Sequence, residues 1–206
     1  MAKNFAKIAF TESVKRQQEK YGSRRQYERM ERIERGTEIG FAEADFISER
    51  DGFYLATVNE SGQPYVQFRG GAPGFLKVLD KKTLAYADFR GNLQYVSVGN
   101  LAENNRAALI LMDYPNRRRL KIFARIEVFE ADEVPELIEK LKDAQYPAKV
   151  ERAMILRVEA FDWNCPQHIT PRFTVEEIRE INQPLYEHIE KLEAKIREMK
   201  GENNDD

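Results

Sequence analysis

The feature that most constrains the fold of this chain is a succession of short apolar segments between residues 53 and 161. They occupy residues 53–58, 64–69, 75–79, 84–87, 107–112, 120–129 and 153–161. The first two flank the turn sequence Asn59-Glu60-Ser61-Gly62, and few helical stretches separate the others. A parallel sheet would require more crossover helices. The pattern therefore predicts a mostly β, antiparallel barrel with peripheral helices.

Three stretches within the barrel region have the composition of short helices, namely residues 42–49, 93–103 and 134–142. The uninterrupted apolar run at residues 107–112 is bounded by Arg106 and Asp113. Such a run is typical of a strand that is buried on both faces, and this is what we expect of it.

The first forty residues are polar and predict a helical extension. Ser23 with Gln26 matches a capping box, and Gly36 suits a helix end. The extension has too few apolar residues to fold alone, so we expect it to lie against the core or against a partner chain.

A second helical extension follows the barrel, where Thr174 and Glu177 form another capping-box pattern. Apolar residues then recur at steps of three and four, which indicates a packing face: Ile178, Ile181, Leu185, Ile189, Leu192, Ile196 and Met199. Pro184 is expected to kink or restart this helix. The predicted organisation is a helical extension at 1–40, a barrel domain at 41–173, and an amphipathic helix with a polar tail at 174–206.

Composition narrows the class of protein. The net charge of −2 argues against general binding of nucleic acid, and no apolar run approaches the length of a membrane span. The start of the chain lacks an apolar signal core, and Cys165 is the single cysteine, so no intrachain disulfide is expected. These features predict a cytoplasmic protein.

The densest group of polar and aromatic side chains spans residues 162–172 and includes Trp163, Cys165, Gln167, His168 and Arg172. A rigid turn, a Cys–His nucleophile pair and a metal site are all compatible with it. Two ligands do not complete a zinc site, and no orienting acid stands beside the pair, so we predict no metal and name no catalytic residue. The run Arg117-Arg118-Arg119 reads as a solvated face from which one arginine can reach an anionic cofactor.

Two clusters have the chemistry of an anion site. In the stretch 67–77, glycines allow close approach of a ligand, and Arg69 and Lys77 can neutralise a phosphate, although a β-bulge with surface charges would have the same composition. In the stretch 88–92, Arg90 lies beside an expected helix start, where free N–H groups favour anions. Simple capping by Asn92 is the alternative there.

The order of these clusters, followed by Asn104-Asn105-Arg106 and the apolar run at 107–112, resembles that of the pyridoxamine 5′-phosphate oxidase-like flavoproteins. The resemblance covers about residues 53–172. Residues 65–79, 88–100, 113–117 and 161–174 are similar to a bacterial subgroup of flavin-nucleotide-binding proteins.

The resemblance implies a split β-barrel that forms a homodimer and binds two FMN molecules in clefts between the subunits. It implies flavin contacts along one edge from Gln67, Arg69, Gly70, Gly71, Phe75, Leu76 and Lys77. It places Asp88, Arg90 and Asn92 near the ribityl phosphate. Arg119, Trp163 and Gln167 are the candidates to close the cleft from the other subunit.

The chain departs from the oxidases of this family at two places. Residues 89–92 read Phe-Arg-Gly-Asn where the oxidases carry a Ser-Arg-Lys-type signature, and a long helix replaces their Trp-containing end. FMN is therefore better supported than a vitamin substrate. The resulting hypothesis is an FMN-dependent oxidoreductase that exchanges electrons with a small molecule or NAD(P)H. The sequence does not identify the substrate. The alternatives are a flavin carrier or sensor without turnover, and an adaptor that uses the basic turn and terminal helices.

Overall fold

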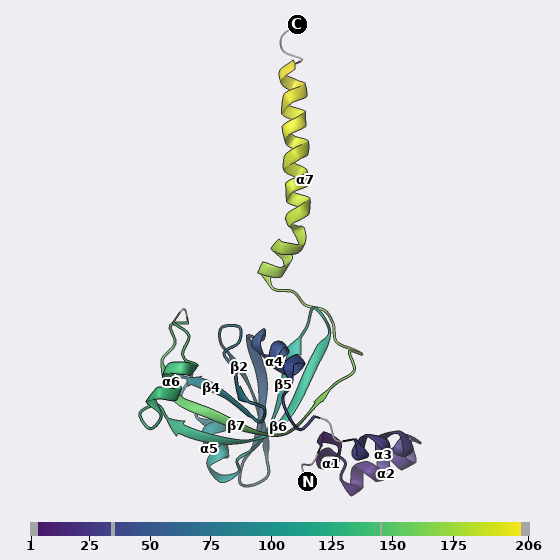
Figure 1. The fold of residues 1–206 in the computed structure, drawn as a ribbon, viewed down its shortest axis with the longest axis vertical. Coiled ribbons are helices and arrows are strands. Elements are labelled where there is room, and N and C mark those ends of the chain that lie inside the picture. The colour runs from purple at the N-terminus through teal and green to yellow at the C-terminus, as the bar shows by residue number, and fades with distance from the viewer. Residues whose placement is uncertain (1–3, 34–35, 145, 203–206) are drawn as a thin grey trace. The chain divides into compact units, whose positions relative to one another are not determined.

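A computed structural model describes residues 4–33, 36–144 and 146–202 of the 206-residue chain. It divides into two compact units. The first comprises Met1–Asp113 and Arg118–Gln167, and the second comprises Tyr114–Arg117 and His168–Asp206. Figure 1 labels the helices, which are α1 (Phe5–Ala9), α2 (Glu12–Lys20), α3 (Arg24–Arg32), α4 (Phe41–Ser48), α5 (Val96–Glu103), α6 (Pro135–Leu141) and α7 (Val175–Glu202).

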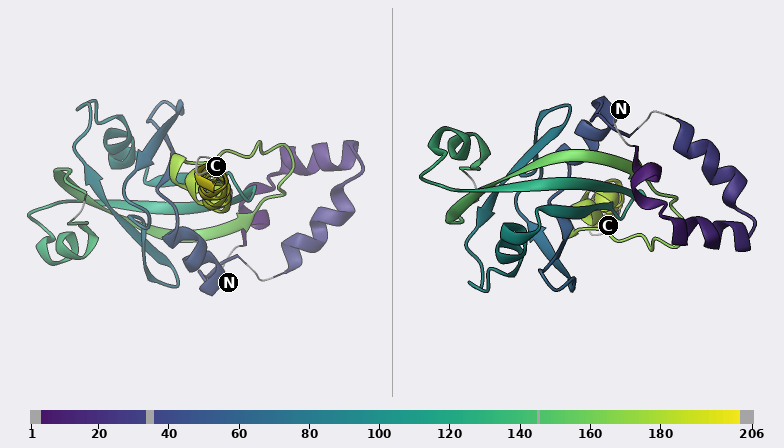
Figure 2. Two further views of the ribbon diagram at one scale, coloured as in Figure 1. Left: turned by 90° about the horizontal axis from the view of Figure 1, so that it is seen from above. Right: turned by 90° about the horizontal axis from the view of Figure 1, so that it is seen from below.

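The first unit is built on a seven-stranded sheet with the order β2-β1-β5-β6-β7-β4-β3, in which every neighbouring pair is antiparallel. The sheet is strongly twisted and curled (Figures 1 and 2). The predicted fold, a mostly β split barrel with peripheral helices, is confirmed. The strands are β1 (Gly52–Val58), β2 (Pro64–Gly70), β3 (Lys77–Asp80), β4 (Thr83–Phe89), β5 (Arg106–Asp113), β6 (Arg118–Glu130) and β7 (Val150–Trp163).

Alternation of buried and exposed side chains gives the barrel one inner face. In β5, Leu109 and Leu111 are fully buried, whereas Ile110 between them is 39% exposed. The prediction that residues 107–112 are buried on both faces is therefore wrong. The reason is that β5 pairs antiparallel with β1 and β6, so no crossover helix covers its outer face.

Short connections and helices complete the barrel much as the sequence predicts. Helix α4 begins and ends within one residue of the predicted range, and α6 lies inside its own. Helix α5 begins at Val96, three residues later than predicted, because Leu93 and Tyr95 adopt left-handed backbone angles with φ of 63° and 52°. Asn92 is consequently not the helix cap, and its Oδ1 accepts a hydrogen bond from the N–H of Gln94 at 3.2 Å.

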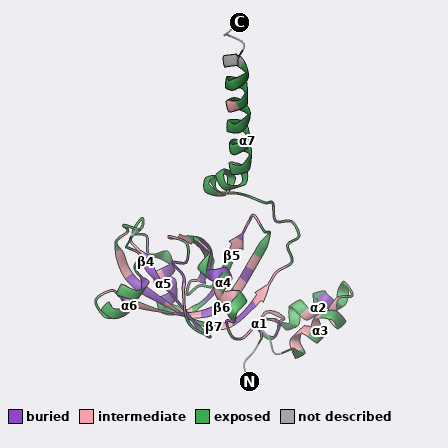
Figure 3. Ribbon diagram, turned by 45° about the horizontal axis from the view of Figure 1, so that its top comes forward, coloured by how far each residue is buried: buried purple, intermediate pink, exposed green. Residues whose placement is uncertain are grey.

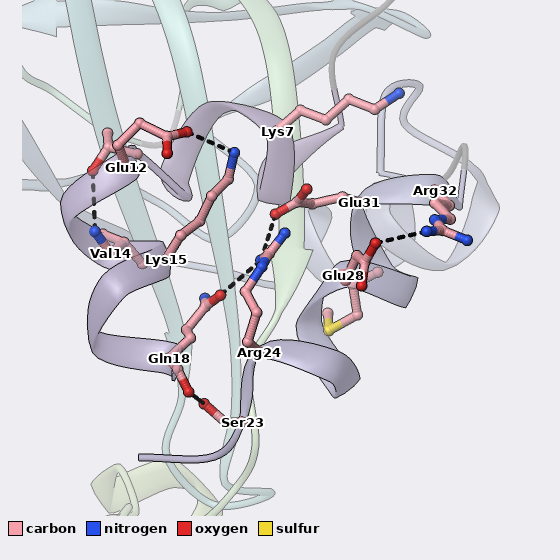
Figure 4. A network of polar contacts seen from close by, with 12 residues as sticks. Lys7, Glu12, Val14, Lys15, Gln18, Ser23, Arg24, Glu28, Glu31 and Arg32 are labelled. Carbon is pink, nitrogen blue, oxygen red and sulfur yellow. Dashed lines mark hydrogen bonds and ion pairs between the residues drawn. The ribbon is translucent and has the colours of Figure 1, made fainter. Parts of the chain in front are cut away.

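The N-terminal helices α1 to α3 are joined by polar contacts (Figure 4). Arg24 donates to Gln18 Oε1 and to Glu31 Oε1, both at 2.8 Å. The ring of Phe5 stacks on Phe123 of β6 with centroids 4.4 Å apart, so α1 contacts the barrel. Ser23 is the N-cap of α3 as predicted, but its hydroxyl donates to Gln18 O at 3.5 Å and makes no capping bond within the described residues.

The second unit is dominated by α7. Its predicted capping box is present, since Glu177 N donates to Thr174 Oγ1 at 3.1 Å and Thr174 N donates to Glu177 Oε2 at 2.7 Å. The helix runs on through Pro184, so the residue does not restart it. Exposed residues follow α7 along almost its whole length (Figure 3). In the described part of the chain, no helix is both long and apolar enough to cross a membrane.

Candidate functional site

A polar pocket of about 40 Å³ lies where β2, β4 and β7 meet the start of α5. Three classes of group line it: charged side chains from the strands, backbone of the loop before α5, and the first turn of that helix. The lining residues are Tyr65, Gln67, Arg69, Asp88, Phe89, Gly91, Asn92, Leu93, Gln94, Tyr95, Val96, Ser97, Val98, Glu151 and Arg152.

Asp88 is the central charge of this pocket. Its carboxylate lies 2.6 Å from Arg69 Nη1 and 3.3 Å from Arg152 Nη1, and only 4% of the residue is exposed. Asp88 and Arg152 are register partners on β4 and β7, whereas Arg69 reaches in from β2 at the other edge of the sheet. Burial raises the pKa of Asp88, and the two guanidinium groups oppose that rise.

The two arginines keep unused donors. Among the described residues, the Nε atoms of Arg69 and Arg152 are buried and have no hydrogen-bond partner, although Arg152 Nε lies 3.3 Å from the Glu130 carboxylate as an ion pair. The Arg152 guanidinium also lies over the ring of Tyr95, 4.8 Å from its centroid. Buried donors without partners are costly, and an anion that accepts from them would remove that cost.

The start of α5 adds helix N–H groups to the same pocket. Its N-cap, Tyr95, makes no side-chain capping bond to the described residues, and Val96, Ser97 and Val98 of the first turn line the pocket. Ser97 donates to Gln67 Oε1 at 2.9 Å, which ties the helix to β2. An uncapped helix start with a left-handed N-cap is a strained arrangement that suits an anion.

The structure brings together four of the residues that the sequence predicts for a flavin site, namely Gln67, Arg69, Asp88 and Asn92. Arg90 lies beside them but outside the lining. Its backbone N–H donates to Lys149 O at 2.8 Å, and its half-exposed side chain lies 3.6 Å from the Glu151 carboxylate.

The predicted residues between β2 and β3 lie elsewhere. A Cβ on Gly71 would meet the ring of Phe75 at 2.6 Å, so the close approach at this glycine is to a side chain of the same chain. Phe75 and Leu76 are buried in the hydrophobic core, where Phe75 stacks on Phe53. A ligand could contact them only through their backbone. Gly70 ends β2, and Lys77 is half-exposed at the start of β3.

The three residues predicted to close the cleft from a partner are near the paired ends of β6 and β7. Trp163 Nε1 donates to Glu43 Oε1 at 2.8 Å, and its ring packs against Phe46. Arg119 Nη2 donates to the carbonyl of Cys165 at 3.4 Å, and Gln167 is exposed. None of the three lines the pocket around Asp88.

Sequence reasoning missed Arg152, Tyr95 and Ser97. The only available signal was the charge of Arg152 just before the apolar run at residues 153–156, and the predicted strand began one residue after it. Among the described residues, no group of three or more His, Cys, Asp or Glu side chains is arranged to hold a metal ion.

A larger, more open pocket of about 750 Å³ lies along β1, β5 and β6 beneath α1. It is mainly apolar, with Lys7, Arg106 and Arg125 as its cations, and it contains none of the predicted flavin residues. Its lining is Lys7, Ile8, Ala56, Thr57, Val58, Pro64, Arg106, Ala107, Ala108, Phe123, Arg125 and Glu159.

Comparisons with known proteins add a sequence relationship. The sequence model of one family, described as pyridoxamine 5′-phosphate oxidase, matches residues 42–181, about two thirds of the chain. No curated protein matches the sequence.

The chain is also similar, at low identity, to several solved structures. HupZ of Group A Streptococcus is 16% identical over 66% of this chain and 99% of its own, with a TM-score of 0.47. An F420 reductase is 19% identical over 60% and 98% of the two chains, with a TM-score of 0.45. An FMN-binding protein from Syntrophomonas wolfei is 12% identical over 71% and 96%, with a TM-score of 0.46. Since none of these TM-scores reaches 0.5, the relationship rests on the sequence match alone.

Proposed function

Because this chain belongs to the pyridoxamine 5′-phosphate oxidase family, we propose that it is an FMN-dependent oxidoreductase whose pocket around Asp88 holds the phosphate end of the cofactor. The observation that carries this proposal is a pair of arginines beside the uncapped start of α5: the partly buried Arg69, whose Nε has no hydrogen-bond partner among the described residues, and the buried Arg152, whose Nε is ion-paired with Glu130. A phosphate has the charge and the acceptor oxygens that both features favour.

The residues present fit this group. Gln67 offers an amide to a flavin edge, and Arg69 and Arg152 offer charge-assisted hydrogen bonds to a phosphate. Bound FMN would supply the electron transfer itself, so the duty of the chain is to bind, orient and shield the cofactor. NAD(P)H or a small organic molecule would supply or receive the electrons.

We also propose that the cofactor cleft is completed by a second copy of the chain. The pocket of about 40 Å³ is far smaller than the several hundred Å³ of typical ligand sites, so one chain accommodates little more than the phosphate. An apolar outer face lies on β2, β1 and β5, on the side of β2 opposite to Gln67 and Arg69. It consists of Tyr54, Val66, Phe68 and Ile110, which are 40, 59, 57 and 39% exposed and share one side of the sheet by register. A second barrel would cover this face.

The test of the cofactor site compares three variants, Arg69→Gln, Arg152→Gln and the control Arg157→Gln. Arg157 lies on the same strand as Arg152 but is exposed and paired with Glu127. Each lost charge-assisted bond is worth about 1.5–3 kcal/mol, so the first two variants should weaken FMN by roughly tenfold or more. The control should bind FMN as the unsubstituted protein does, and melting curves would verify that all three remain folded.

Riboflavin identifies the role of the phosphate. It lacks that group, so it should bind poorly to the unsubstituted protein and should not distinguish the variants. Equal binding of riboflavin and FMN would contradict the assignment of the pocket to the phosphate. Preferential retention of F420 would contradict the assignment of FMN as the cofactor. Reduction of the bound flavin by NADH or NADPH, followed by reoxidation, tests the oxidoreductase activity. If the bound flavin is neither reduced by these donors nor reoxidised by an acceptor, the remaining interpretation is a flavin carrier or sensor.

A further inference from the structure

The apolar stripe of α7 is the feature that the proposed function does not use. Ile178, Leu185, Ile189 and Leu192 are between 41 and 55% exposed, on a helix of 28 residues. A stripe of large apolar side chains on a long helix is stable in water only when another surface covers it.

The stripe follows a heptad repeat, which Ile181 at a g position and Tyr186 at an e position broaden in the first half of the helix. Val175, Asn182, Ile189 and Ile196 are spaced by seven residues and occupy the a positions. Ile178, Leu185, Leu192 and Met199 occupy the d positions, three residues after each a position. The repeat spans about three and a half heptads, the length at which such a pattern indicates a coiled coil. β-branched residues at a with leucine at d favour two parallel strands.

Asn182 specifies how two such helices would meet. It is the single polar residue among the eight core positions, and a lone asparagine at an a position fixes register in parallel dimers. In a parallel pair in register, the two Asn182 amides face one another and can exchange a hydrogen bond. Any shifted or antiparallel pairing would place each amide against apolar side chains and leave it unsatisfied.

One pair of flanking positions favours self-pairing, whereas the next g and e positions, Lys195 and Lys200, are both lysine. His188 occupies a g position, and in a parallel pair it faces the e position five residues later, which is Glu193 of the second copy. Pro184 occupies a c position on the outer side, away from the core of the pair. Ala194 occupies an f position, the most outward of the seven.

We propose that α7 pairs with α7 of a second copy of this chain as a parallel, two-stranded coiled coil in register. This inference does not depend on the flavin site. If the barrels also dimerise as proposed above, each helix would meet its equivalent at high effective concentration, which would strengthen the pairing without any new contact.

The test is disulfide cross-linking of the full-length chain after Cys165→Ser removes the native thiol, which is exposed. Ile189→Cys and Ile196→Cys are made separately, with Ala194→Cys as the matched control. In a parallel pair, equivalent a positions lie within the 4.4–6.8 Å Cα separation that a disulfide requires. Both variants should then form covalent dimers under mild oxidation, and the control should form far fewer.

Alternative arrangements give different results. In an antiparallel pair centred on residue 189, the two copies of residue 196 would be about 21 Å apart along the axis, so only Ile189→Cys would cross-link. Helices that pack on their own barrel would give no covalent dimer in either variant. Cross-linking of Ala194→Cys as fast as the two core variants would indicate random collision. Each of these three results would overturn the proposal, and none depends on whether the protein binds a flavin, since the reaction is run on protein freed of ligand.

Discussion

Asp88 couples the proposed cofactor site to pH. Its carboxylate faces Arg69 and Arg152, with Glu151 also nearby, and burial raises its pKa. Because the pKa is higher in the folded state than in the unfolded state, the contribution of Asp88 to stability is complete at low pH. It is lost as the pH rises through the raised value.

We predict that the affinity for FMN, like the stability contribution of Asp88, decreases as the pH rises. Once Asp88 is ionised it repels a bound phosphate and competes for both arginines, so affinity should fall as the pH rises through its pKa. Isothermal titration across pH, on the unsubstituted protein and Asp88→Asn, measures this effect. The phosphate of FMN titrates in both proteins, so the difference between the two profiles isolates Asp88. Profiles that remain parallel at every pH would contradict the prediction.

Gly74, in the loop between β2 and β3, is predicted to tolerate substitution less well than Gly62. Gly74 has φ of 75°, and a Cβ there would meet the carbonyl oxygen of Ser48 at 2.7 Å. Gly62 has a similar φ of 85°, but a Cβ there would meet nothing within 4 Å. Substitution of Gly62 therefore measures the cost of the backbone conformation without a steric clash. Gly62→Ala should lower the free energy of unfolding by about 1 kcal/mol, and Gly74→Ala by clearly more. Chemical denaturation measures both, and equal losses would refute the steric argument.

At this scale the sequence identified part of the candidate site. The resemblance to the flavoproteins predicted Gln67, Arg69, Asp88 and Asn92 for the site, and the structure brings them together. Arg152 was missed because its role depends on pairing with Asp88 across 64 positions of sequence, which no local pattern encodes. Phe75 and Leu76 were grouped with the site by proximity in sequence, whereas their apolar side chains turn to the core.

Among the elements, the N-terminal helices depend on one buried side chain. Asn4 caps α1 by accepting from Lys7 N at 2.9 Å, and its Nδ2 donates to three carbonyls at the end of α3, those of Met30, Glu31 and Ile33. Asn4→Ala would leave these groups without that partner, each at a cost of about 1–3 kcal/mol when buried.

We therefore predict that Asn4→Ala loosens α1 to α3 while the barrel stays folded. Limited proteolysis should cut within residues 5–33 faster, and the melting of the barrel should change little. Thr11→Ala is the matched control, because Thr11 caps α2 through a single exposed bond of 3.4 Å. Equal protease sensitivity of the two variants would show that Asn4 does not hold the helices together.

The positions of helices and strands could be predicted from the sequence pattern wherever short-range interactions alone determine them. Helix α4, the hairpin of β1 and β2 and the capping box of α7 were predicted within a residue or two. The start of α5 was misplaced because Leu93 and Tyr95 take left-handed angles that their side chains do not favour. The exposure of β5 was missed because an apolar outer face, like that of Ile110, resembles a buried one in sequence.

At the scale of the whole molecule, the outer face of β2, β1 and β5 should control assembly. Val66→Asp places a charge on the most exposed residue of the apolar face, and Leu79→Asp places one at an exposed position on β3. Burying an unpaired charge in an interface costs several kcal/mol. Light scattering over a dilution series should show at least a tenfold weaker dimer for Val66→Asp and no change for Leu79→Asp. A monomer at micromolar concentration before any substitution would refute the dimer itself.

The order of the strands has a mechanical consequence. β2 and β3 lie at opposite ends of the sheet, yet only residues 71–76 separate them in the chain, so the barrel has a seam sealed by that short strap. The strap is fastened by hydrogen bonds from Gly71 N to Asp51 O and from Gly74 N to Arg50 O. The ion pair of Arg69 and Asp88 is a second fastening, with one partner on each side. An anion bound by Arg69 of β2 and Arg152 of β7 would hold the two sides of this seam together. The amide hydrogens of β2 and β4 should then exchange with deuterium more slowly when the anion is bound. Those of β5 and β6, on the far side of the barrel, should exchange as before.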